Sequence, residues 1–515
     1  MSAEPSQSSL HEEWVAAGRT YAWDLIASLI LFVSASLMAG RVWRFPFDDE
    51  IYTLTIAESS RSALEVLIFY LKGSDVHPPL ADFIFYTLHH LGLSEAAMRV
   101  CSLAMTAASL VLFHRLTLAI VGERTHATVG TTTRLIAVLL FGLSPMAVSM
   151  GDAIRWYPLF ALLFSVFFTL YLVAGNAATK LGSAVALGLA ASTNFLAAIV
   201  IIPLLLYRYA LQRQFRPSFE SAYWLVFSLF GSLGFISAFS IVVSPLGPVA
   251  LHQFGNSPFR ALATDVLGFF GGDALGVSQA WIIMPVAIIT AWAMFSEIDR
   301  ARPANPVHLF LLTFGAMALM VLASFGKPRS FLYLAPVLAA ILTFFLDRKA
   351  RDCKAGTTTV LAALILAASV AAIANLNHGT RPFKRNSVIP YEQILDFIRT
   401  NEKGNVLIVS SDSIVVWELR HRGQQADRCV SFFAREAACF TADHHYDSIF
   451  VISGHSYRSG IVRFMNRFEA LLNPMIAGRR KIAELHAGLD EDAALKSRLT
   501  GVPLDEFILT IDLYQ

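Results

Sequence analysis

The chain has 515 residues, of which 55% are hydrophobic and only 15% are charged, and its mean hydropathy is +0.56. Soluble proteins carry roughly 25% charged residues, so this composition excludes an ordinary soluble protein and indicates a polytopic membrane protein. The formal net charge of +2 is too small for a nucleic-acid-binding protein. Lys and Arg occur in short clusters between apolar stretches, as in loops that set membrane topology.

Apolar stretches suited to membrane crossing recur along most of the chain. A helix needs about 20 residues to cross about 30 Å of hydrocarbon. The stretch Leu181–Tyr209 is interrupted by Ser192-Thr193-Asn194, which favours two short helices over one long tilted helix, and the sequence then predicts about eleven transmembrane helices. The candidate stretches are Asp24–Gly40, Ala96–Val121, Leu135–Met150, Tyr157–Ala174, Leu181–Tyr209, Ala222–Val243, Ala280–Phe295, Val307–Phe325, Phe331–Leu346 and Thr359–Ala374.

The basic loops give the predicted orientation. If these loops are cytoplasmic, the N-terminus lies inside and the segments rich in unusual polar motifs all lie outside. The basic loops are 123–134, Lys180, 208–216, 299–302 and 347–351. The outside segments are then 48–50, 151–156, 244–277, 326–330 and the C-terminal part.

The composition changes from His378 onward. Short apolar runs at 406–410, 448–453 and 506–512 predict strands, and 391–401 and 461–472 have helical spacing. We therefore expect a transmembrane domain over 1–376, with a first outer loop at 45–95, and a small periplasmic α/β domain over 377–515. Cys429 and Cys439 could pair in that compartment, but sequence does not give their distance.

Three adjacent carboxylates, Asp48-Asp49-Glu50, follow the first apolar stretch. A charge at the bilayer centre costs about 2.5–3.5 kcal/mol on insertion scales, so we expect this triplet at the membrane–water boundary. There it is suited to acid/base chemistry on a lipid-linked substrate. The structural alternative is that these acids only cap the helix that follows.

The rest of the first outer loop predicts two interfacial helices. Apolar residues at helical spacing indicate an amphipathic helix over Ile51–Leu71. Pro78 and Pro79 then interrupt the chain, and a second helix is expected over Ala81–Leu91, ending at Gly92.

Five motifs share this predicted outer face and occur in a characteristic order. They are Phe47-Asp48-Asp49-Glu50-Ile51-Tyr52, His77-Pro78-Pro79-Leu80, Leu93-Ser94-Glu95-Ala96-Ala97-Met98-Arg99, Gly151-Asp152-Ala153-Ile154-Arg155-Trp156-Tyr157-Pro158-Leu159-Phe160 and Lys327-Pro328-Arg329-Ser330-Phe331. Together they resemble the polyprenyl-phosphate-sugar-dependent membrane glycosyltransferases of the GT-C fold. That family includes protein O-mannosyltransferases and lipid A aminoarabinose transferases. The resemblance covers residues 24–346.

The resemblance implies an inverting transfer at the outer face of the membrane, which we expect to be a bacterial inner membrane. An acceptor hydroxyl attacks the anomeric carbon of a sugar on polyprenyl phosphate, and the lipid phosphate leaves. This chemistry needs a carboxylate that takes the acceptor proton and cations that hold the phosphate. The acceptor is expected to be an envelope lipid or glycan, such as lipopolysaccharide, or a protein.

The resemblance also assigns expected roles to residues of this chain. Asp49 is the expected catalytic base, supported by Glu50, with Asp48 as the neighbour that could take its place. The expected phosphate ligands are Arg155, Tyr157, Lys327 and Arg329, and the expected site-lining residues are His77, Asp152 and Lys72. Asp49 and Asp152 are candidate ligands for Mg²⁺ or Mn²⁺.

Each of these residues also has a structural alternative. Asp152 and Arg155 could form a local interfacial ion pair beside an anchoring belt of Trp156 and Tyr157. Lys327 and Arg329 could extend their charges to the membrane surface, and His77 could bond backbone at a helix start. At the level of function, the rival classes are a lipid or lipid-linked-sugar transporter and a non-catalytic scaffold with a sensor domain. A transporter should place ionisable residues near mid-bilayer, whereas here they collect at the ends of the apolar stretches.

Overall fold

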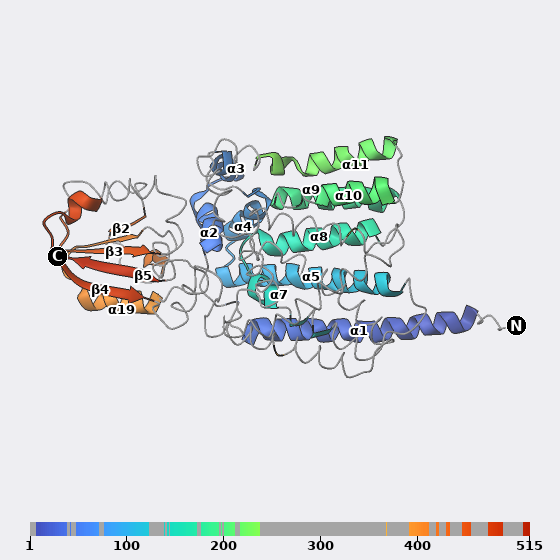
Figure 1. The fold of residues 1–515 in the computed structure, drawn as a ribbon, viewed down its shortest axis with the longest axis horizontal. Helices are drawn as coiled ribbons and strands as arrows, with labels where there is room; N and C mark the ends of the chain where they lie inside the picture. The colour runs from blue at the N-terminus through green and yellow to red at the C-terminus, as the bar shows by residue number, and fades with distance from the viewer. Residues whose placement is uncertain are drawn as a thin grey trace.

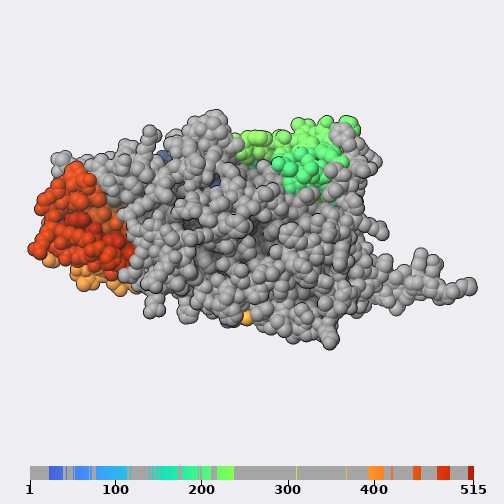
Figure 2. Space-filling model, viewed as in Figure 1, coloured from blue at the N-terminus to red at the C-terminus, as the bar shows by residue number. Residues whose placement is uncertain are grey.

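The structure is a computed structural model of the chain, and it describes part of each of the two predicted domains. A bundle of helices runs from the N-terminal end of the molecule to a C-terminal sheet at the opposite end (Figure 1). The space-filling view shows the sheet in red at one end and α10 and α11 in green on the surface of the other (Figure 2). The described residues are 7–38, 42, 48–71, 77–122, 138–139, 142–143, 145–172, 177–194, 197, 200–211, 217–236, 309, 367, 391–410, 419–421, 429–432, 445–454, 472–487 and 508–515.

Among the described residues, five long helices pack side by side in the bundle (Figure 1). Each packs against the next in the order α1 (Gln7–Met38), α5 (Glu95–Gly122), α8 (Trp156–Leu172), α9 (Ala177–Thr193) and α11 (Pro217–Phe230). A short helix, α7 (Pro145–Met150), contacts α1. The core between them is rich in aromatic rings, with Phe160, Phe164, Phe167 and Phe168 of α8 all fully buried.

The described helices match several predicted spans. Helices α1, α5 and α8 cover the predicted stretches Asp24–Gly40, Ala96–Val121 and Tyr157–Ala174 to within a few residues, except that α1 begins earlier. In the part of the chain that the structure describes, Glu95–Leu112 is apolar and long enough to cross a bilayer, with mean hydropathy 1.4. The stretches Ala22–Met38 and Trp156–Tyr171 are apolar but shorter. Of the predicted stretch Leu135–Met150 the structure describes 138–139, 142–143 and 145–150, the last as α7. The stretches Ala280–Phe295, Val307–Phe325, Phe331–Leu346 and Thr359–Ala374 lie outside the described residues except for Leu309 and Ala367, so the number of spans stays a prediction.

The interruption predicted at Ser192–Asn194 is confirmed. Helix α9 ends at Thr193, and helical structure resumes with α10 (Ile201–Leu205) and the π-helical segment η3 (Leu206–Leu211). The Ser192 hydroxyl donates a hydrogen bond to the carbonyl oxygen of Phe230 at 2.6 Å. This bond satisfies a carbonyl at the end of α11, where no intrahelical partner is available.

The single helix expected over Ile51–Leu71 is wrong, because the chain forms two helices there. Helix α2 (Asp48–Ser59) begins at the acidic triplet, and α3 (Ala63–Leu71) follows after a break. The break is capped as in a capping box, shifted by one residue on one side: the Ser62 hydroxyl accepts the Glu65 N–H at 3.3 Å, and the Glu65 carboxylate accepts the N–H of Arg61, which precedes the N-cap, at 2.6 Å. Such reciprocal bonds satisfy the free N–H groups of a new helix start.

The second interfacial helix is confirmed as α4 (Leu80–His90). It starts directly after Pro78 and Pro79, as expected. At its end, Gly92 has a positive φ of 80°, and the N–H groups of Gly92 and Leu93 bond the carbonyls of His89 and Leu88 at 2.9 and 3.2 Å. This Schellman arrangement favours glycine and turns the chain into α5.

The described residues of the C-terminal part form a five-stranded sheet in the order β2-β1-β3-β5-β4. The strands are β1 (Val406–Ser410), β2 (Cys429–Phe432), β3 (Ser448–Gly454), β4 (Lys481–Ala487) and β5 (Leu509–Tyr514). Strand β1 is parallel to β2 and β3, while β5 is antiparallel to β3 and β4. All five residues of β1 are buried, as is usual for a strand that is covered on both faces.

The sequence predicted some of the strands and helices of the C-terminal part and missed others. Strands β1, β3 and β5 and helix α19 (Tyr391–Asn401) were expected, whereas β2 and β4 were missed. Strand β4 is largely exposed, so it lacks the apolar run by which a buried strand is recognised. Cys429 lies in β2, and Cys439 and most of the helix expected over 461–472 lie outside the described residues.

The sheet and the interfacial helices share one hydrophobic cluster. It joins Ile51 and Leu54 of α2, Phe85 of α4 and Met98 of α5 with residues of α19 and the sheet. Leu419, between β1 and β2, is also buried in it. Nearby, His421 Nε2 lies 3.4 Å from Glu58 Oε2 of α2. The C-terminal sheet thus packs against the helix that carries the acidic triplet.

Candidate functional site

Two of the sequence motifs meet at the end of the bundle that faces the sheet. Helix α2 carries the acidic triplet, and the segment 151–155 leads into α8. The Glu50 side chain is fully buried, and its Oε1 accepts the backbone N–H of Ile154 at 2.8 Å. The segment that precedes Arg155 is therefore held directly by the acidic motif.

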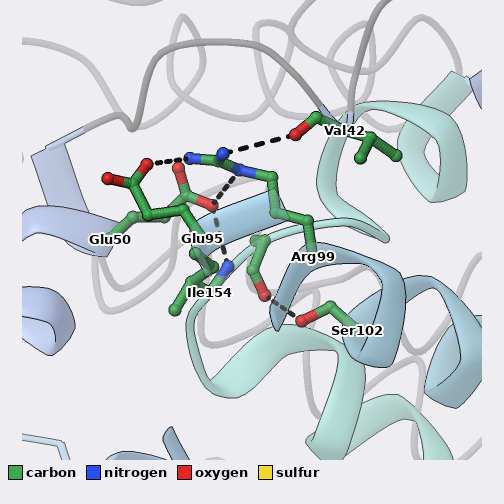
Figure 3. A network of polar contacts seen from close by, with 7 residues as sticks. Val42, Glu50, Glu95, Arg99, Ser102 and Ile154 are labelled. Carbon is green, nitrogen blue, oxygen red and sulfur yellow. Dashed lines mark hydrogen bonds and ion pairs between the residues drawn. The ribbon is translucent and has the colours of Figure 1, made fainter. Parts of the chain in front are cut away.

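Arg99 of α5 closes this network (Figure 3). Its side chain is 2% exposed, and its Nε lies 3.9 Å from Glu50 Oε1. The two terminal nitrogens donate to the Val42 carbonyl and to Glu95 Oε2, each at 3.4 Å. A buried guanidinium requires such partners, because an uncompensated buried charge is costly. Arg99 and Glu95 belong to the third motif, so three motifs contribute to one buried cluster.

Hydroxyl groups of α5 fix the segment 151–155 from the other side. Ser102 Oγ donates to the Ala153 carbonyl at 2.8 Å, and Thr106 Oγ1 donates to the Gly151 carbonyl at 2.9 Å. A side chain at Gly151 would place its Cβ 2.3 Å from the Ala147 carbonyl oxygen. The close approach of backbone to backbone therefore requires glycine at this position.

The side chain of Arg155 lies in a second buried network. Its Nη1 donates to Thr53 Oγ1 of α2 at 3.2 Å and lies 3.8 Å from Asp82 Oδ1 of α4. Its Nη2 lies 3.2 Å from His77 Nδ1. Burial raises the pKa of the Asp82 carboxyl above its ordinary value, and Arg155 and the Thr53 hydroxyl partly offset that effect.

Aromatic rings surround this second network. His77 stacks on Trp156 with their centroids 5.6 Å apart, and Trp156 contacts Tyr157 at 4.1 Å. Tyr157 is buried in the bundle core at the start of α8. The indole N–H of Trp156 is buried and has no hydrogen-bond partner among the described residues. Because buried donors are normally paired, a ligand oxygen placed beside it would satisfy this group.

The structure thus brings together part of the predicted site. Glu50, His77, Asp152, Arg155 and Tyr157 lie where α2, α4 and the start of α8 converge, and Asp152 is fully buried. Asp48 and Asp49 form the first turn of α2, but their side chains lie outside the description. Lys72, Lys327 and Arg329 are outside the described residues. The roles predicted for all of these residues stay predictions.

No group of three or more His, Cys, Asp or Glu side chains is arranged to hold a metal ion within the described ranges. The side chains of Asp48 and Asp49 lie outside the described residues. A metal site at Asp49 and Asp152 therefore stays a prediction.

Sequence reasoning missed the residue at the centre of the second network. Asp82 is 2% exposed and accepts hydrogen bonds from the hydroxyls of Thr53, at 2.5 Å, and Tyr70. The signal that could have identified Asp82 is its charge on a largely apolar interfacial helix. A charge that is buried needs polar partners, so such a residue indicates a polar network. Arg99 belongs to the third motif, but the resemblance assigns it no role.

No protein-family model matches the chain, and no curated protein matches it in sequence. Solved structures do match. Apo ArnT from Cupriavidus metallidurans is 14% identical, with a TM-score of 0.51 over 97% of this chain and 98% of that one. ArnT from the same organism bound to undecaprenyl phosphate gives 12% identity, the same TM-score and the same coverage. The arabinofuranosyltransferase AftD from Mycobacteria gives 16% identity and a TM-score of 0.34 over 96% of this chain and 41% of that one.

The match to ArnT spans nearly the whole of both chains. ArnT is a lipid A aminoarabinose transferase of the GT-C class. The chain therefore shares the GT-C fold of ArnT, and the resemblance predicted from the motifs is confirmed at the level of fold. A fold supports many activities, so the activity has to be argued from the site.

Proposed function

We propose that this GT-C-fold chain is an integral membrane glycosyltransferase that moves a sugar from a polyprenyl-phosphate donor to an acceptor at the outer face of a bacterial inner membrane. The acceptor is an envelope lipid or glycan, or a protein. One observation carries the proposal: Glu50, beside Asp48 and Asp49, binds the backbone of Ile154, so the acidic motif lies directly against the segment that presents Arg155. The structure of ArnT with undecaprenyl phosphate supports the choice of lipid carrier.

In the proposed reaction, Asp49 takes the proton of the acceptor hydroxyl. The hydroxyl oxygen bonds to the anomeric carbon on the face opposite the phosphate. The bond from that carbon to the phosphate oxygen breaks, and its electron pair leaves with the polyprenyl phosphate, so the configuration inverts. A positioned general base contributes typically about 10²–10⁴-fold to such a step.

The leaving phosphate gains negative charge as the bond breaks. Arg155 is suited to stabilise it because its planar guanidinium can bind two phosphate oxygens and is already held in place by buried partners. The buried N–H of Trp156 is a further donor beside His77. Lys327, Arg329 and Tyr157 are proposed to complete the phosphate site, and His77, Asp152 and Lys72 to line it.

The test is release of polyprenyl phosphate by the purified protein when it is given polyprenyl-phosphate sugars and an envelope-lipid extract as acceptor. Asp49→Asn should lower turnover by about 10²–10⁴-fold, and Asp48→Asn should lower it much less. Glu58→Gln is the matched control, because Glu58 lies on the same helix but at its far, exposed end. Release that survives the double substitution Asp48→Asn and Asp49→Asn would contradict the mechanism. Movement of intact donor across a vesicle membrane without release would favour the transporter alternative.

A further inference from the structure

Asp82 is a buried carboxylate that interacts with side chains from three other segments of the chain. Its Oδ1 accepts the Thr53 hydroxyl of α2 at 2.5 Å, and its Oδ2 accepts the Tyr70 hydroxyl of α3. Arg155, which precedes α8, lies 3.8 Å from Oδ1. Asp82 is buried, and both of its carboxylate oxygens already accept hydrogen bonds from protein hydroxyls. Its effect on the site has to pass through the groups that it holds.

Asp82 is linked to the guanidinium of Arg155 through the hydroxyl of Thr53. Arg155 Nη1 donates to Thr53 Oγ1 at 3.2 Å, and the same hydroxyl donates to Asp82. A hydroxyl has one proton to donate, so the Thr53 proton points toward Asp82 and its lone pairs toward Arg155. The hydrogen bonds thus run in one direction, from Arg155 through Thr53 to Asp82.

The other end of the guanidinium faces His77. Arg155 Nη2 lies 3.2 Å from His77 Nδ1, and arginine can only donate. Nδ1 is therefore the acceptor, so the proton of a neutral His77 lies on Nε2. With Nη1 held by Thr53 and Nη2 by His77, both the plane and the direction of the guanidinium are fixed, as bidentate recognition of an oxyanion requires.

We infer that Asp82 is a positioning residue for the lipid-phosphate leaving group: through Thr53 and its own charge it orients Arg155 toward that phosphate. This inference rests on the proposed function of Arg155. It assigns Asp82 a part in turnover that differs from general support of the fold. The two hydroxyls that donate to Asp82 separate these roles, because Thr53 contacts both Asp82 and Arg155, whereas Tyr70 contacts Asp82 from the opposite oxygen.

The test is a double-mutant cycle on kcat/KM for the polyprenyl-phosphate sugar. Asp82→Asn should lower kcat/KM about tenfold in the wild-type background, mainly through kcat, and less than about twofold in the Arg155→Gln background, since directly coupled residues are strongly non-additive. Thr53→Val should behave as Asp82→Asn does. Tyr70→Phe, which also removes one hydroxyl from Asp82, should lower kcat/KM less than Thr53→Val.

Thermal unfolding of each purified variant shows whether a loss of turnover reflects a loss of fold. Binding of undecaprenyl phosphate shows whether the proposed function itself holds. Additive effects of Asp82→Asn and Arg155→Gln, or equal losses of turnover in Thr53→Val and Tyr70→Phe, would overturn the positioning role while leaving the transferase proposal intact. A wild-type protein that neither binds undecaprenyl phosphate nor releases it from any donor would overturn the proposed function, and this inference with it. If Asp82→Asn fails to fold, the comparison of Thr53→Val with Tyr70→Phe still decides the question.

Discussion

The carboxylate of Glu50 and the backbone N–H of Ile154 form a hydrogen bond of 2.8 Å between positions 104 residues apart. The bond is buried, and Arg99 lies on the same carboxylate oxygen at 3.9 Å. It fixes the start of α2 against the segment that leads into α8. The acidic motif therefore has a structural contact in addition to any catalytic one, and the two contributions can be separated by substitution.

Glu50→Ala should destabilise the protein strongly. It leaves the Arg99 guanidinium without its most buried partner and the Ile154 N–H without an acceptor, which costs about 3–5 kcal/mol for a broken buried pair. Glu50→Gln keeps an acceptor for Ile154 and should cost less. Glu95→Ala is the control, because Glu95 also contacts Arg99 but is 35% exposed, and such pairs contribute about 0.2–1 kcal/mol. Thermal unfolding in detergent measures all three, and equal losses from Glu50→Ala and Glu95→Ala would contradict this account.

Gly188→Leu should disrupt the packing of α9 on α11. A Cβ at Gly188 would lie 2.7 Å from the Phe227 carbonyl oxygen and 2.9 Å from Phe230 Cβ, so the two helices would have to separate. Overpacking of this kind costs typically about 1–3 kcal/mol. Gly182→Ala on the same helix should be mild, because its Cβ meets only the end of the Leu170 side chain, at 3.3 Å. The midpoint of thermal unfolding should fall clearly for the first variant and little for the second.

The ion cluster between β4 and β5 should make stability depend on pH. Lys481 Nζ lies 2.7 Å from Asp512 and 2.9 Å from Glu484. These bonds raise the pKa of Lys481 above its ordinary 10.5, and Lys481 lowers the pKa of Glu484 below its ordinary 4.5. The Lys481 contribution is therefore complete below pH 10.5 and is lost as pH rises through the raised pKa. The Glu484 contribution is complete above pH 4.5 and is lost as pH falls through the lowered pKa.

Comparison with Lys481→Gln across the pH range checks this prediction. The advantage of the wild type in thermal unfolding should be small, because the cluster is partly exposed, and it should be present throughout the range between these limits. It should disappear in strong acid and in strong alkali. An advantage that grew toward alkaline pH would contradict the assigned sign.

The contact between the C-terminal sheet and the interfacial helices should depend on Leu419 more than on His421. Leu419 is 1% exposed within the shared hydrophobic cluster, and replacing a buried leucine by alanine typically costs about 2–5 kcal/mol. His421 and Glu58 are both partly exposed, so His421→Ala should cost far less. Hydrogen exchange of α2 amides should rise in Leu419→Ala and stay close to wild type in His421→Ala. The reverse ranking would show that the ion pair, rather than the cluster, holds the sheet in place.

Local signals predicted the elements best. The prolines before α4, the glycine after it and the apolar runs of β1 and β3 all act within a few residues, so their effect is visible in the chain. The break between α2 and α3 also had a local signal, Ser62 and Glu65 at capping-box spacing, which the amphipathic pattern obscured. Exposed strand β4 had no comparable signal, because its pairing with β5 rather than its own composition makes it a strand.

The sequence by itself determined the membrane-type composition, the order of the motifs and the acidic triplet at the start of α2, because hydropathy and motif order are properties of the chain alone. Only the tertiary structure decided which of these charges meet. The partnership of Glu50 with Ile154 and of Arg155 with Thr53 and Asp82 joins segments far apart in the chain. The physical reason is that a buried ion must find partners wherever packing brings them, whatever their separation in sequence.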